Sequence, residues 1–315
     1  MHWNKFGNSL LLAAVSEFTS KKDFVQHVTH VLYDYIKLTK PRIMLLVVVS
    51  GVTAAIMESS LLSRPFDFTL AMLALYLTGG SANAFNNYFE REKDRLMVRT
   101  REKRPLPAGR IKPKNALLFA MCIGALGVFL YAFFFNALSA LLSLATIVFY
   151  SIIYTLWLKP NTRHNTVIGG AAGAMAPVGV WAAASGSLAI TPWTLFLIIF
   201  FWSPPHFWAL AVSLKDDYRA ANFKMLPVIR GEGETLHQIF IFSILLFFVS
   251  ITPFLVQSGL LYLCIAIVFG IPFIKKAWTA RVSQKPKDIW SVFVYSILYL
   301  FILFFALIVD SFFMV

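Results

Sequence analysis

IWSVFVYSILYLFILFFALIV, residues 289–309, decides the class of fold to which this chain belongs. It contains no charged residue and matches the roughly 20 apolar residues that a helix needs to cross a bilayer. ALSALLSLATIVFYSIIYTLWL, residues 137–158, has the same character, and seven more apolar stretches precede and separate these two. The sequence therefore predicts an all-α, polytopic membrane protein with about nine transmembrane helices. The predicted spans are 43–60, 68–89, 115–135, 137–158, 166–187, 191–214, 236–257, 259–275 and 289–309.

The composition excludes several other classes of protein. Of the 315 residues, 58% are hydrophobic and 14% are charged, whereas a soluble domain has about 25% charged residues. Disordered chains need low hydrophobicity, and two cysteines are too few for a disulfide scaffold. The formal net charge of +13 taken alone suggests a nucleic-acid partner. The uninterrupted apolar sequence argues against that interpretation, and we expect membrane lipid and no nucleic acid as partner.

The positions of the basic residues predict the orientation of the helices. All 28 Lys and Arg except Arg64 fall on one side of a nine-span topology. Their segments are 1–42, 90–114, 159–165, 215–235 and 275–288. Lys and Arg gather on the cytoplasmic side of membranes, so the N-terminus is expected in the cytoplasm and the C-terminus outside. The fifth span, 166–187, is rich in small residues that let helices approach closely, which predicts an interior helix.

We expect one transmembrane domain, 35–310, between a cytoplasmic tail, 1–34, and a short external tail, 311–315. The stretch 22–38 is either an amphipathic helix on the membrane surface or part of a loosely ordered tail. Residues 1–34 show no cleavable signal and no long Arg- and Ser-rich presequence, so a bacterial cytoplasmic (inner) membrane is the expected location.

The first acidic segment continues the second span out of the membrane. Asn86, Glu90 and Asp94 have the spacing i, i+4, i+8, so they share one face of a helix. Carboxylate and amide oxygens at one face suit a hard cation such as Mg²⁺, which takes further ligands from water or a phosphate. The alternative is a helix end that turns polar where it enters water.

A second acidic segment follows the sixth span. Lys215, Asp216 and Asp217 come directly after its last apolar residues. The two aspartates could ligate a second cation or form a solvated helix end. Aspartate at a helix C-terminus opposes the helix macrodipole, which favours a functional reason for its presence.

Basic residues accompany both acidic segments on the predicted cytoplasmic face. Arg99 and Arg101 follow the first acidic stripe, and Lys159 and Arg163 lie in the loop after the fourth span. These side chains could bind an anionic substrate, with Arg suited to forked contacts with phosphate. The alternative is attraction to lipid headgroups. Acids for a cation beside bases for an anion favour a metal–diphosphate site.

His206 is an ionisable residue inside a predicted span, in the motif SPPHFW at 203–208. Pro204 and Pro205 beside it free backbone carbonyls and predict a kink. An ionisable side chain within the membrane is a functional candidate. The alternative is a histidine hydrogen-bonded to one of the freed carbonyls.

Four segments together resemble a known family. The Asn86–Glu90–Asp94 stripe with RTREKRPLPAGRI after it is similar to the first motif of the UbiA-type intramembrane prenyltransferases. YIKLTKPRI (35–43), YTLWLKPNTRHNTVIGGAAGAMAPVGVWAA (154–183) and FWSPPHFWALAVSLKDDYRAANFKMLPVIRG (201–231) resemble its protoheme IX farnesyltransferase (heme O synthase) branch. The resemblance extends from about residue 35 to 231.

The resemblance implies nine helices around a central cavity that opens to the cytoplasmic side. It also implies transfer of the farnesyl group of farnesyl diphosphate to a vinyl group of heme b, giving heme O, with a downstream heme A synthase as a further partner. Mg²⁺ would be the cofactor, and heme b a substrate. The implied catalytic residues are Asn86, Glu90, Asp94, His206, Asp216 and Asp217. Of these, the implied metal ligands are Asn86, Glu90, Asp94 and Asp217. The implied diphosphate ligands are Arg99, Arg101, Lys159, Arg163 and Lys215. His206 would bind heme or carry a proton.

Two positions depart from the superfamily pattern. Glu90 stands where many members have Asp, and Ser213 stands where the first Asp of the second motif would fall. Two other functions remain as alternatives. One is a prenyltransferase with a quinone-precursor or chlorophyll-type acceptor. The other is a transporter with a midplane site at the broken helices, although the acids here gather at one face instead.

Overall fold

The computed structural model describes residue 26 and residues 28–313. All regular structure in this part of the chain is helical, and nine helical segments of it are long and apolar enough to cross a membrane. These are Pro41–Glu58 (α2), Pro65–Leu96 (α3), Pro113–Phe134 (α5), Ala137–Asn161 (α6, Ala137–Val148; η1, Phe149–Leu158; α7, Lys159–Asn161), Asn165–Ser185 (α8), Ile190–Ser213 (α9), Gly231–Val256 (α12, Gly231–Ser250; α13, Thr252–Val256), Leu260–Ser283 (α14) and Pro286–Phe313 (α15). The all-α, nine-span prediction is confirmed.

The chain begins and ends its helices where local chemistry directs it. Proline stands at the start of α2, α3, α5 and α15, where its fixed φ suits a helix and its missing N–H is not needed. Three spans extend five or more residues beyond a predicted end: α3 to Leu96, α14 to Ser283, and α12 back to Gly231. Charged residues mark the end of the apolar stretch, but Glu, Lys and Arg are good helix formers and the helices continue through them.

Both ends of the predicted domain are helical in the described part of the chain. Residues 28–38 are helical, and Asp34 in this segment pairs with Arg110 at 2.9 Å. The last helix, α15, continues to Phe313, so residues 311–313 are part of a helix instead of a tail. Residues 1–25, 27 and 314–315, which hold most of the predicted N-terminal tail, lie outside the described residues.

Helix α8 lies in the interior of the bundle, as its small residues predict. It packs against α2, α3, α6, η1 and α9. It also contributes to both large apolar cores: Ala174 and Trp181 belong to the core built with α9, α12, α14 and α15, and Ala176 and Val180 to the core built with α2, α3 and α5. Gly186, with φ 69°, ends the helix in the left-handed conformation that glycine tolerates.

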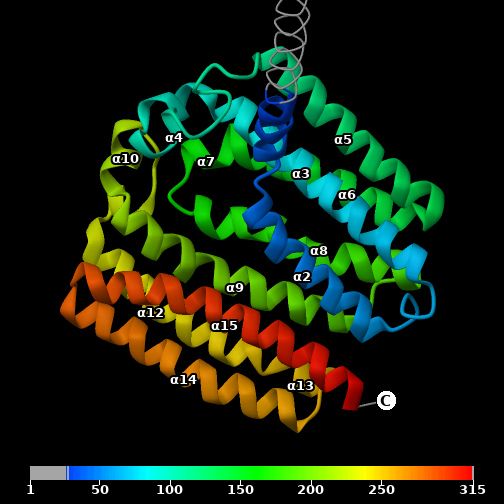
Figure 1. Cartoon of the computed structure of the whole chain (residues 1–315). Coiled ribbons are helices and arrows are strands. Elements are labelled where there is room, and N and C mark those ends of the chain that lie inside the picture. The colour runs from blue at the N-terminus through cyan, green and yellow to red at the C-terminus, as the bar shows by residue number, and fades with distance from the viewer. Residues whose placement is uncertain (1–25, 27, 314–315) are drawn as a thin grey trace, which may run out of the picture.

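The functional side chains come from one end of this bundle. Three short helices lie there together in Figure 1: α4 (Val98–Arg101), α7 and α10 (Lys215–Ala220). Another short helix, α11 (Leu226–Ile229), precedes α12. The opposite end carries α13 and the last turn of α15. We call the end with α4, α7 and α10 the basic end, because among the described residues all Lys and Arg except Arg64 fall in the segments that meet there.

Candidate active site

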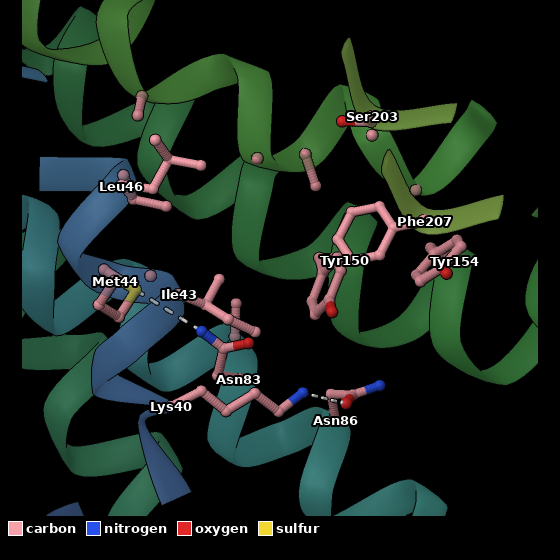
Figure 2. A pocket seen from close by; sticks show the side chains of 18 of the residues that line it. Lys40, Ile43, Met44, Leu46, Asn83, Asn86, Tyr150, Tyr154, Ser203 and Phe207 are labelled. Atoms are coloured by element: carbon pink, nitrogen blue, oxygen red, sulfur yellow. Dashed lines mark hydrogen bonds between the residues drawn. The ribbon is translucent and has the colours of Figure 1, made fainter. Parts of the chain in front are cut away.

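A pocket of about 480 Å³ lies within the bundle. Its walls come from α2, α3, α5, α6, η1, α8, α9 and α15, and its charged residues come from the basic end. Figure 2 shows side chains from several of these helices, among them Lys40, Asn86, Tyr150, Tyr154 and Phe207, facing a common space. Apart from the polar end, its lining is dominated by aliphatic and aromatic side chains and glycines, so the pocket joins a charged mouth to an apolar chamber.

The acidic stripe of α3 lies at this polar end. Asn86, Glu90 and Asp94 line the pocket, and their exposed fractions are 1%, 5% and 0%. They are therefore not a helix end entering water, which was the alternative interpretation of their spacing. Burying two carboxylates is costly unless they are paired, and the structure supplies a basic partner for each member of the stripe.

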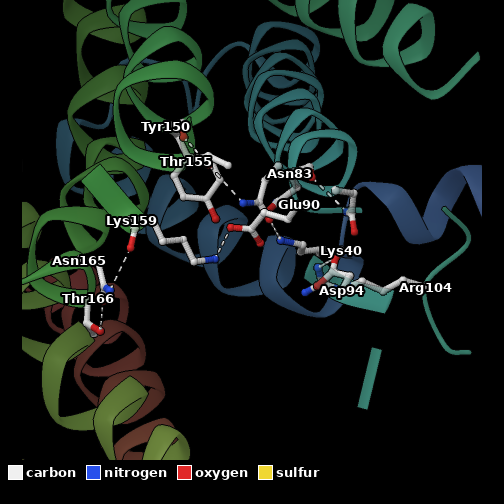
Figure 3. Close-up of polar contacts among 12 residues, drawn as sticks. Lys40, Asn83, Glu90, Asp94, Arg104, Tyr150, Thr155, Lys159, Asn165 and Thr166 are labelled. Carbon is white, nitrogen blue, oxygen red and sulfur yellow. Dashed lines mark hydrogen bonds and ion pairs between the residues drawn. The ribbon is translucent and has the colours of Figure 1, made fainter. Parts of the chain in front are cut away.

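Three bases pair with the stripe, as Figure 3 shows for its two carboxylates. The Lys40 ammonium donates to Asn86 Oδ1 at 2.7 Å. Lys159 forms an ion pair with Glu90, and Arg104 with Asp94. Lys159 follows η1 directly, Arg104 follows α4, and Lys40 precedes α2, so three separate segments converge on one helix.

Two polar atoms at this end are buried without a hydrogen-bond partner. One is Asp94 Oδ1, an acceptor, and the other is Arg99 Nε, a donor. Both residues line the pocket. A buried unpaired polar atom costs about 1–3 kcal/mol, so these two atoms point to a ligand that accepts from Arg99 and to a cation that Asp94 binds.

The donor set of the stripe fits a hard cation. Asn86, Glu90 and Asp94 offer amide and carboxylate oxygens, which Mg²⁺ prefers, and one of these oxygens is unpaired. Among the described residues no three His, Cys, Asp or Glu side chains form a complete metal cluster. A Mg²⁺ ion here would take further ligands from water and substrate phosphate, which is its usual behaviour.

The second acidic segment does not reach the pocket lining. Asp216 is on the surface with a 92% exposed side chain and pairs with Arg219 at 2.8 Å. Asp217 accepts the backbone N–H groups of Val98 and Arg99, each at 3.2 Å. Lys215 pairs with Glu232 at 3.0 Å. The structure thus does not bring these three residues together with the α3 stripe, and their predicted roles in binding metal and diphosphate stay predictions.

The predicted diphosphate ligands divide into two groups. Arg99 and Lys159 line the pocket. Arg101 is exposed and pairs with Glu102 at 3.4 Å, and Arg163 is exposed beside His164. Some of these bases face the pocket and others face away, because neighbouring side chains along a short helix or loop point in different directions. Residue type alone does not reveal the direction of a side chain.

Two bases that pair with the stripe were missing from the predicted site residues, Lys40 and Arg104. Arg104 is one of five basic residues between positions 99 and 110, and nothing in the sequence separates it from Arg101. Lys40 offers a better signal, since the Lys40–Pro41 pair lies directly before the first span. A residue before proline avoids helical backbone angles, yet Lys40 has φ 53° and ψ 63°. This unusual left-handed conformation aims the lysine at α3 and is of the kind that clusters at functional sites.

The environment of Lys40 also changes its protonation. Burial of the ammonium group, together with the positive charges of Arg104 and Lys159, lowers the pKa of Lys40 to about 7. The carboxylates of Glu90 and Asp94 act in the opposite direction and only partly compensate. Lys40 is therefore a base whose charge changes near neutral pH.

His206 lies on the α9 wall of the pocket and is 8% exposed. Its Nδ1 lies 2.8 Å from Ser296 Oγ on α15. The ring stacks between Trp202 and Phe293, with centroid distances of 4.3 and 4.7 Å. Helix α9 continues through Pro204 and Pro205 without ending. Ser296 fixes the ring orientation, which differs from the alternative of a bond to a carbonyl freed by the prolines.

Five aromatic residues on α3, η1 and α9 divide between the pocket and a neighbouring small core. Tyr150, Tyr154 and Trp202 line the pocket. Phe85 and Tyr88, on a different face of α3 from the stripe, instead pack in a small core with Leu38 and Leu106. Tyr150 and Tyr154 stack at 5.3 Å between ring centroids, and Lys159 Nζ lies 6.0 Å from the Tyr154 ring.

Known proteins with the same architecture were found by sequence and by structure. Residues 45–308 match the UbiA prenyltransferase family. Protoheme IX farnesyltransferase from Synechocystis is 43% identical over 93% of this chain and 94% of its own length, and that from Symbiobacterium thermophilum is 41% identical over 93% and 98%.

Solved structures share the fold at low sequence identity. A digeranylgeranylglyceryl phosphate synthase superposes with a TM-score of 0.73, at 19% identity over 89% of this chain and 98% of its own. A UbiA homologue from Archaeoglobus fulgidus bound to GPP and Mg²⁺ gives 0.61, at 18% identity over 88% and 99%. With the full-length sequence relatives, these findings place the chain in the UbiA prenyltransferase family, among the protoheme IX farnesyltransferases.

Proposed function

We propose that this protein transfers the farnesyl group of farnesyl diphosphate to a vinyl group of heme b, giving heme O and diphosphate. The names of its full-length relatives support the donor and the acceptor. The observation that carries the proposal is the pocket itself, which joins a cluster of buried acids and bases to an apolar chamber. A prenyl diphosphate has the same division between a charged head and an apolar chain.

The diphosphate head would lie among the bases of the polar end. Arg99 offers a buried, unpaired Nε, and Lys40, Arg104 and Lys159 offer positive charge from three directions. Asn86, Glu90 and Asp94 would hold Mg²⁺, which as a Lewis acid stabilises negative charge on the leaving diphosphate. When the donor binds, Lys159 and Arg104 would exchange part of their pairing with Glu90 and Asp94 for contacts with the diphosphate oxygens. These bases are already in place for the negative charge that develops on the leaving diphosphate.

The apolar chamber would protect the reactive chain. The allylic C–O bond breaks with its electron pair on the diphosphate, and the farnesyl cation that remains must be kept from water until a heme vinyl group attacks it. Tyr150 and Tyr154 present aromatic faces near the polar end, where a cation–π contact stabilises such a cation. Addition of water to the resulting heme-based cation, with loss of a proton to solvent, completes the hydroxyethylfarnesyl group.

His206 is our candidate for contact with heme. Ser296 occupies its Nδ1, which leaves Nε2 as the ring nitrogen for a ligand. Trp202 and Phe293 both stack against the ring and hold it in place. A role in binding iron or a propionate, or in carrying a proton, is consistent with this position. A quinone-precursor acceptor is the competing proposal, and it would not need a fixed histidine here.

The location follows from the distribution of charge. We propose that the protein lies in a bacterial cytoplasmic membrane, with the basic end and the N-terminus in the cytoplasm and the C-terminus outside. A downstream heme A synthase remains a predicted partner. Fusing alkaline phosphatase and green fluorescent protein separately to the C-terminus tests the orientation: phosphatase activity without fluorescence supports it, and the reverse result contradicts it.

The experiment that tests the function uses membranes containing the full chain. They are incubated with heme b, radiolabelled farnesyl diphosphate and Mg²⁺, and the heme fraction is separated by chromatography. We expect label in a farnesylated heme, no label in membranes lacking the protein, and loss of product with a chelator. Transfer of label to an added quinone precursor, with none to heme, would refute the proposed acceptor.

A further inference from the structure

Four glycines of the interior helix α8 line the pocket: Gly169, Gly170, Gly173 and Gly179. Glycine weakens the interior of a helix, because it adds conformational freedom to the unfolded chain. Each of these positions therefore needs a reason for having no side chain.

Two of the four are explained by packing. A Cβ at Gly169 would lie 2.5 Å from the ring of Tyr154, and a Cβ at Gly170 would lie 2.8 Å from Cβ of Ser203. Both distances are shorter than van der Waals contact, so no side chain fits. These glycines let α8 approach η1 and α9.

The other two are not explained by packing. A Cβ at Gly173 or at Gly179 would meet no atom within 4 Å. Gly173 is exposed although α8 packs against five neighbouring elements, and the space it faces is the pocket. Alanine at either position would stabilise the helix without a clash, so what glycine provides here is open volume in the pocket.

Gly179 lies at the far end of the pocket from the acidic stripe. Helix α8 lines the pocket from Thr166 to Gly179, and α3 lines it from Asp94 to Leu75. At 1.5 Å per residue these stretches measure roughly 20 Å on α8 and roughly 28 Å on α3, so the pocket runs deep into the bundle. The far ends of the two stretches, at Leu75 on α3 and Gly179 on α8, lie at the same depth. A Cβ added at Gly51 on α2 would touch both Leu75 and Val180, the residue after Gly179.

The deep part of the pocket suits an isoprenoid chain better than a porphyrin. Its lining beyond Gly173 includes Ser50, Leu75, Thr78, Tyr131, Ala176 and Gly179, and no charged residue that could pair with heme propionates. The hydroxyls of Ser50, Thr78 and Tyr131 donate to backbone carbonyls at 2.8, 2.9 and 3.0 Å, so their polar atoms are already paired.

His206 belongs to a different part of the pocket. Ser203 on α9 lies beside Gly170, and the deepest pocket residue of α9 is Ile199, one helical turn further in. Helices α9 and α15 thus contribute to the mouth and the middle of the pocket, and α2, α3, α5, α6 and α8 alone contribute to its deep end.

We propose that Gly179 sets the length of the prenyl chain that the protein accepts, and that Gly173 keeps the path to it open. This inference rests on the proposed function, and it adds the residue that selects the donor. The diphosphate is held at the α3 stripe, the chain runs along α8, and its last isoprene unit occupies the space above the Gly179 backbone. A side chain at 179 fills that space and shortens the acceptable donor.

Donor competition tests the proposal. Full-length wild type and Gly179→Leu are given heme b with geranyl, farnesyl or geranylgeranyl diphosphate, and kcat/KM is measured for each. We expect the ratio of geranyl to farnesyl transfer to rise by at least about tenfold in Gly179→Leu. A single extra methylene that an apolar pocket cannot accommodate already changes the preference between two substrates by about that factor. The KM for heme should stay unchanged.

Three further variants keep the test decisive if Gly179→Leu folds poorly. Gly179→Ala should raise the melting temperature slightly and still shift the ratio in the same direction, a combination that a purely structural role does not give. Gly233→Ala, at a helical glycine outside the pocket with only Gln284 Nε2 at 4.0 Å, should leave the ratio unchanged. Gly169→Ala should lower stability and reduce transfer from all donors alike.

The outcomes separate the two proposals. An unchanged donor ratio in an active Gly179→Ala, or a raised KM for heme in place of a shifted ratio, overturns the role of Gly179. Absence of transfer to heme by wild type with every donor overturns the proposed function instead.

Discussion

The Asp217 carboxylate accepts the backbone N–H of Arg99 at 3.2 Å, and it accepts the neighbouring N–H of Val98 at the same distance. This contact joins two segments that are 118 residues apart in sequence, the short helix α10 and the start of α4. Arg99 then carries its unpaired Nε into the pocket wall. An aspartate of the predicted second metal motif is thus engaged in holding a predicted diphosphate ligand.

Asp217→Asn separates these two roles. An amide keeps one acceptor oxygen and loses the charge, so the α4 segment is held less firmly, and a lost hydrogen bond to a charged group costs about 1.5–3 kcal/mol. We expect KM for farnesyl diphosphate to rise on the order of tenfold, with the Mg²⁺ concentration for half-maximal activity unchanged. A large increase in that Mg²⁺ concentration would show that Asp217 ligates the metal. Asp216→Asn, at an exposed neighbour, is the matched control and should behave like wild type.

Glu90→Gln tests the acidic stripe. The amide removes the charge that pairs with Lys159 and that would hold Mg²⁺. Loss of one electrostatic contact to a developing charge costs about 10²–10³ in kcat, and we expect a decrease of that size in farnesyl transfer. Glu92→Gln on the same helix is the control, since its side chain is 63% exposed and pairs only with surface arginines. Full activity of Glu90→Gln would refute the metal assignment.

Arg104 and Asp94 should be coupled in stability. Asp94 is fully buried and Arg104 is its ion-pair partner. Arg104→Ala leaves an unpaired buried carboxylate, which costs about 3–5 kcal/mol, whereas Arg104→Ala with Asp94→Ala removes both charges and should recover part of that loss. The measurement is thermal unfolding of detergent-solubilised protein. Strictly additive effects of the two changes would contradict the coupling.

Lys40 predicts a pH dependence of donor binding. Its pKa is lowered to about 7, so the free protein loses this positive charge as the pH rises through 7. We expect kcat/KM for farnesyl diphosphate to fall above that pH, because this parameter reports the ionisation of the free enzyme. Lys40→Arg, which stays charged, should abolish this decline; an unchanged profile in Lys40→Arg would assign it to another group.

The same shift has a consequence for folding. The pKa of Lys40 in the folded protein lies below its ordinary value of 10.5, so between about pH 7 and 10.5 the unfolded chain binds more protons than the folded one. Stability contributed by this residue therefore rises with pH across that window and is lost as the pH falls through 7. Thermal unfolding of Lys40→Met should lack this contribution, and an equal pH slope in both proteins would contradict it.

The membrane class and the number of helices could be predicted because each follows from local sequence. A span is an unbroken apolar stretch of a fixed length, and bilayer thickness sets that length wherever it occurs. The stripe of Asn86, Glu90 and Asp94 could be predicted for a similar reason, since helical spacing alone puts three residues on one face. The end of α3 at Leu96 could not be predicted in this way, because a helix can continue into water after its apolar residues end.

Which bases meet that stripe was decided only by the tertiary structure. Lys40, Arg104 and Lys159 come from three segments that are distant in sequence, whereas Arg101 and Arg163 have the same charge and are exposed. Likewise, Asp217 looks like a metal ligand in sequence, but the packing of α10 against α4 gives it two backbone N–H groups. The spans, the acidic face and the family could be predicted from the sequence, because these depend on residues close along the chain. The partners of each charge and the open space at Gly179 depend on how distant helices pack, and only the folded chain defines them.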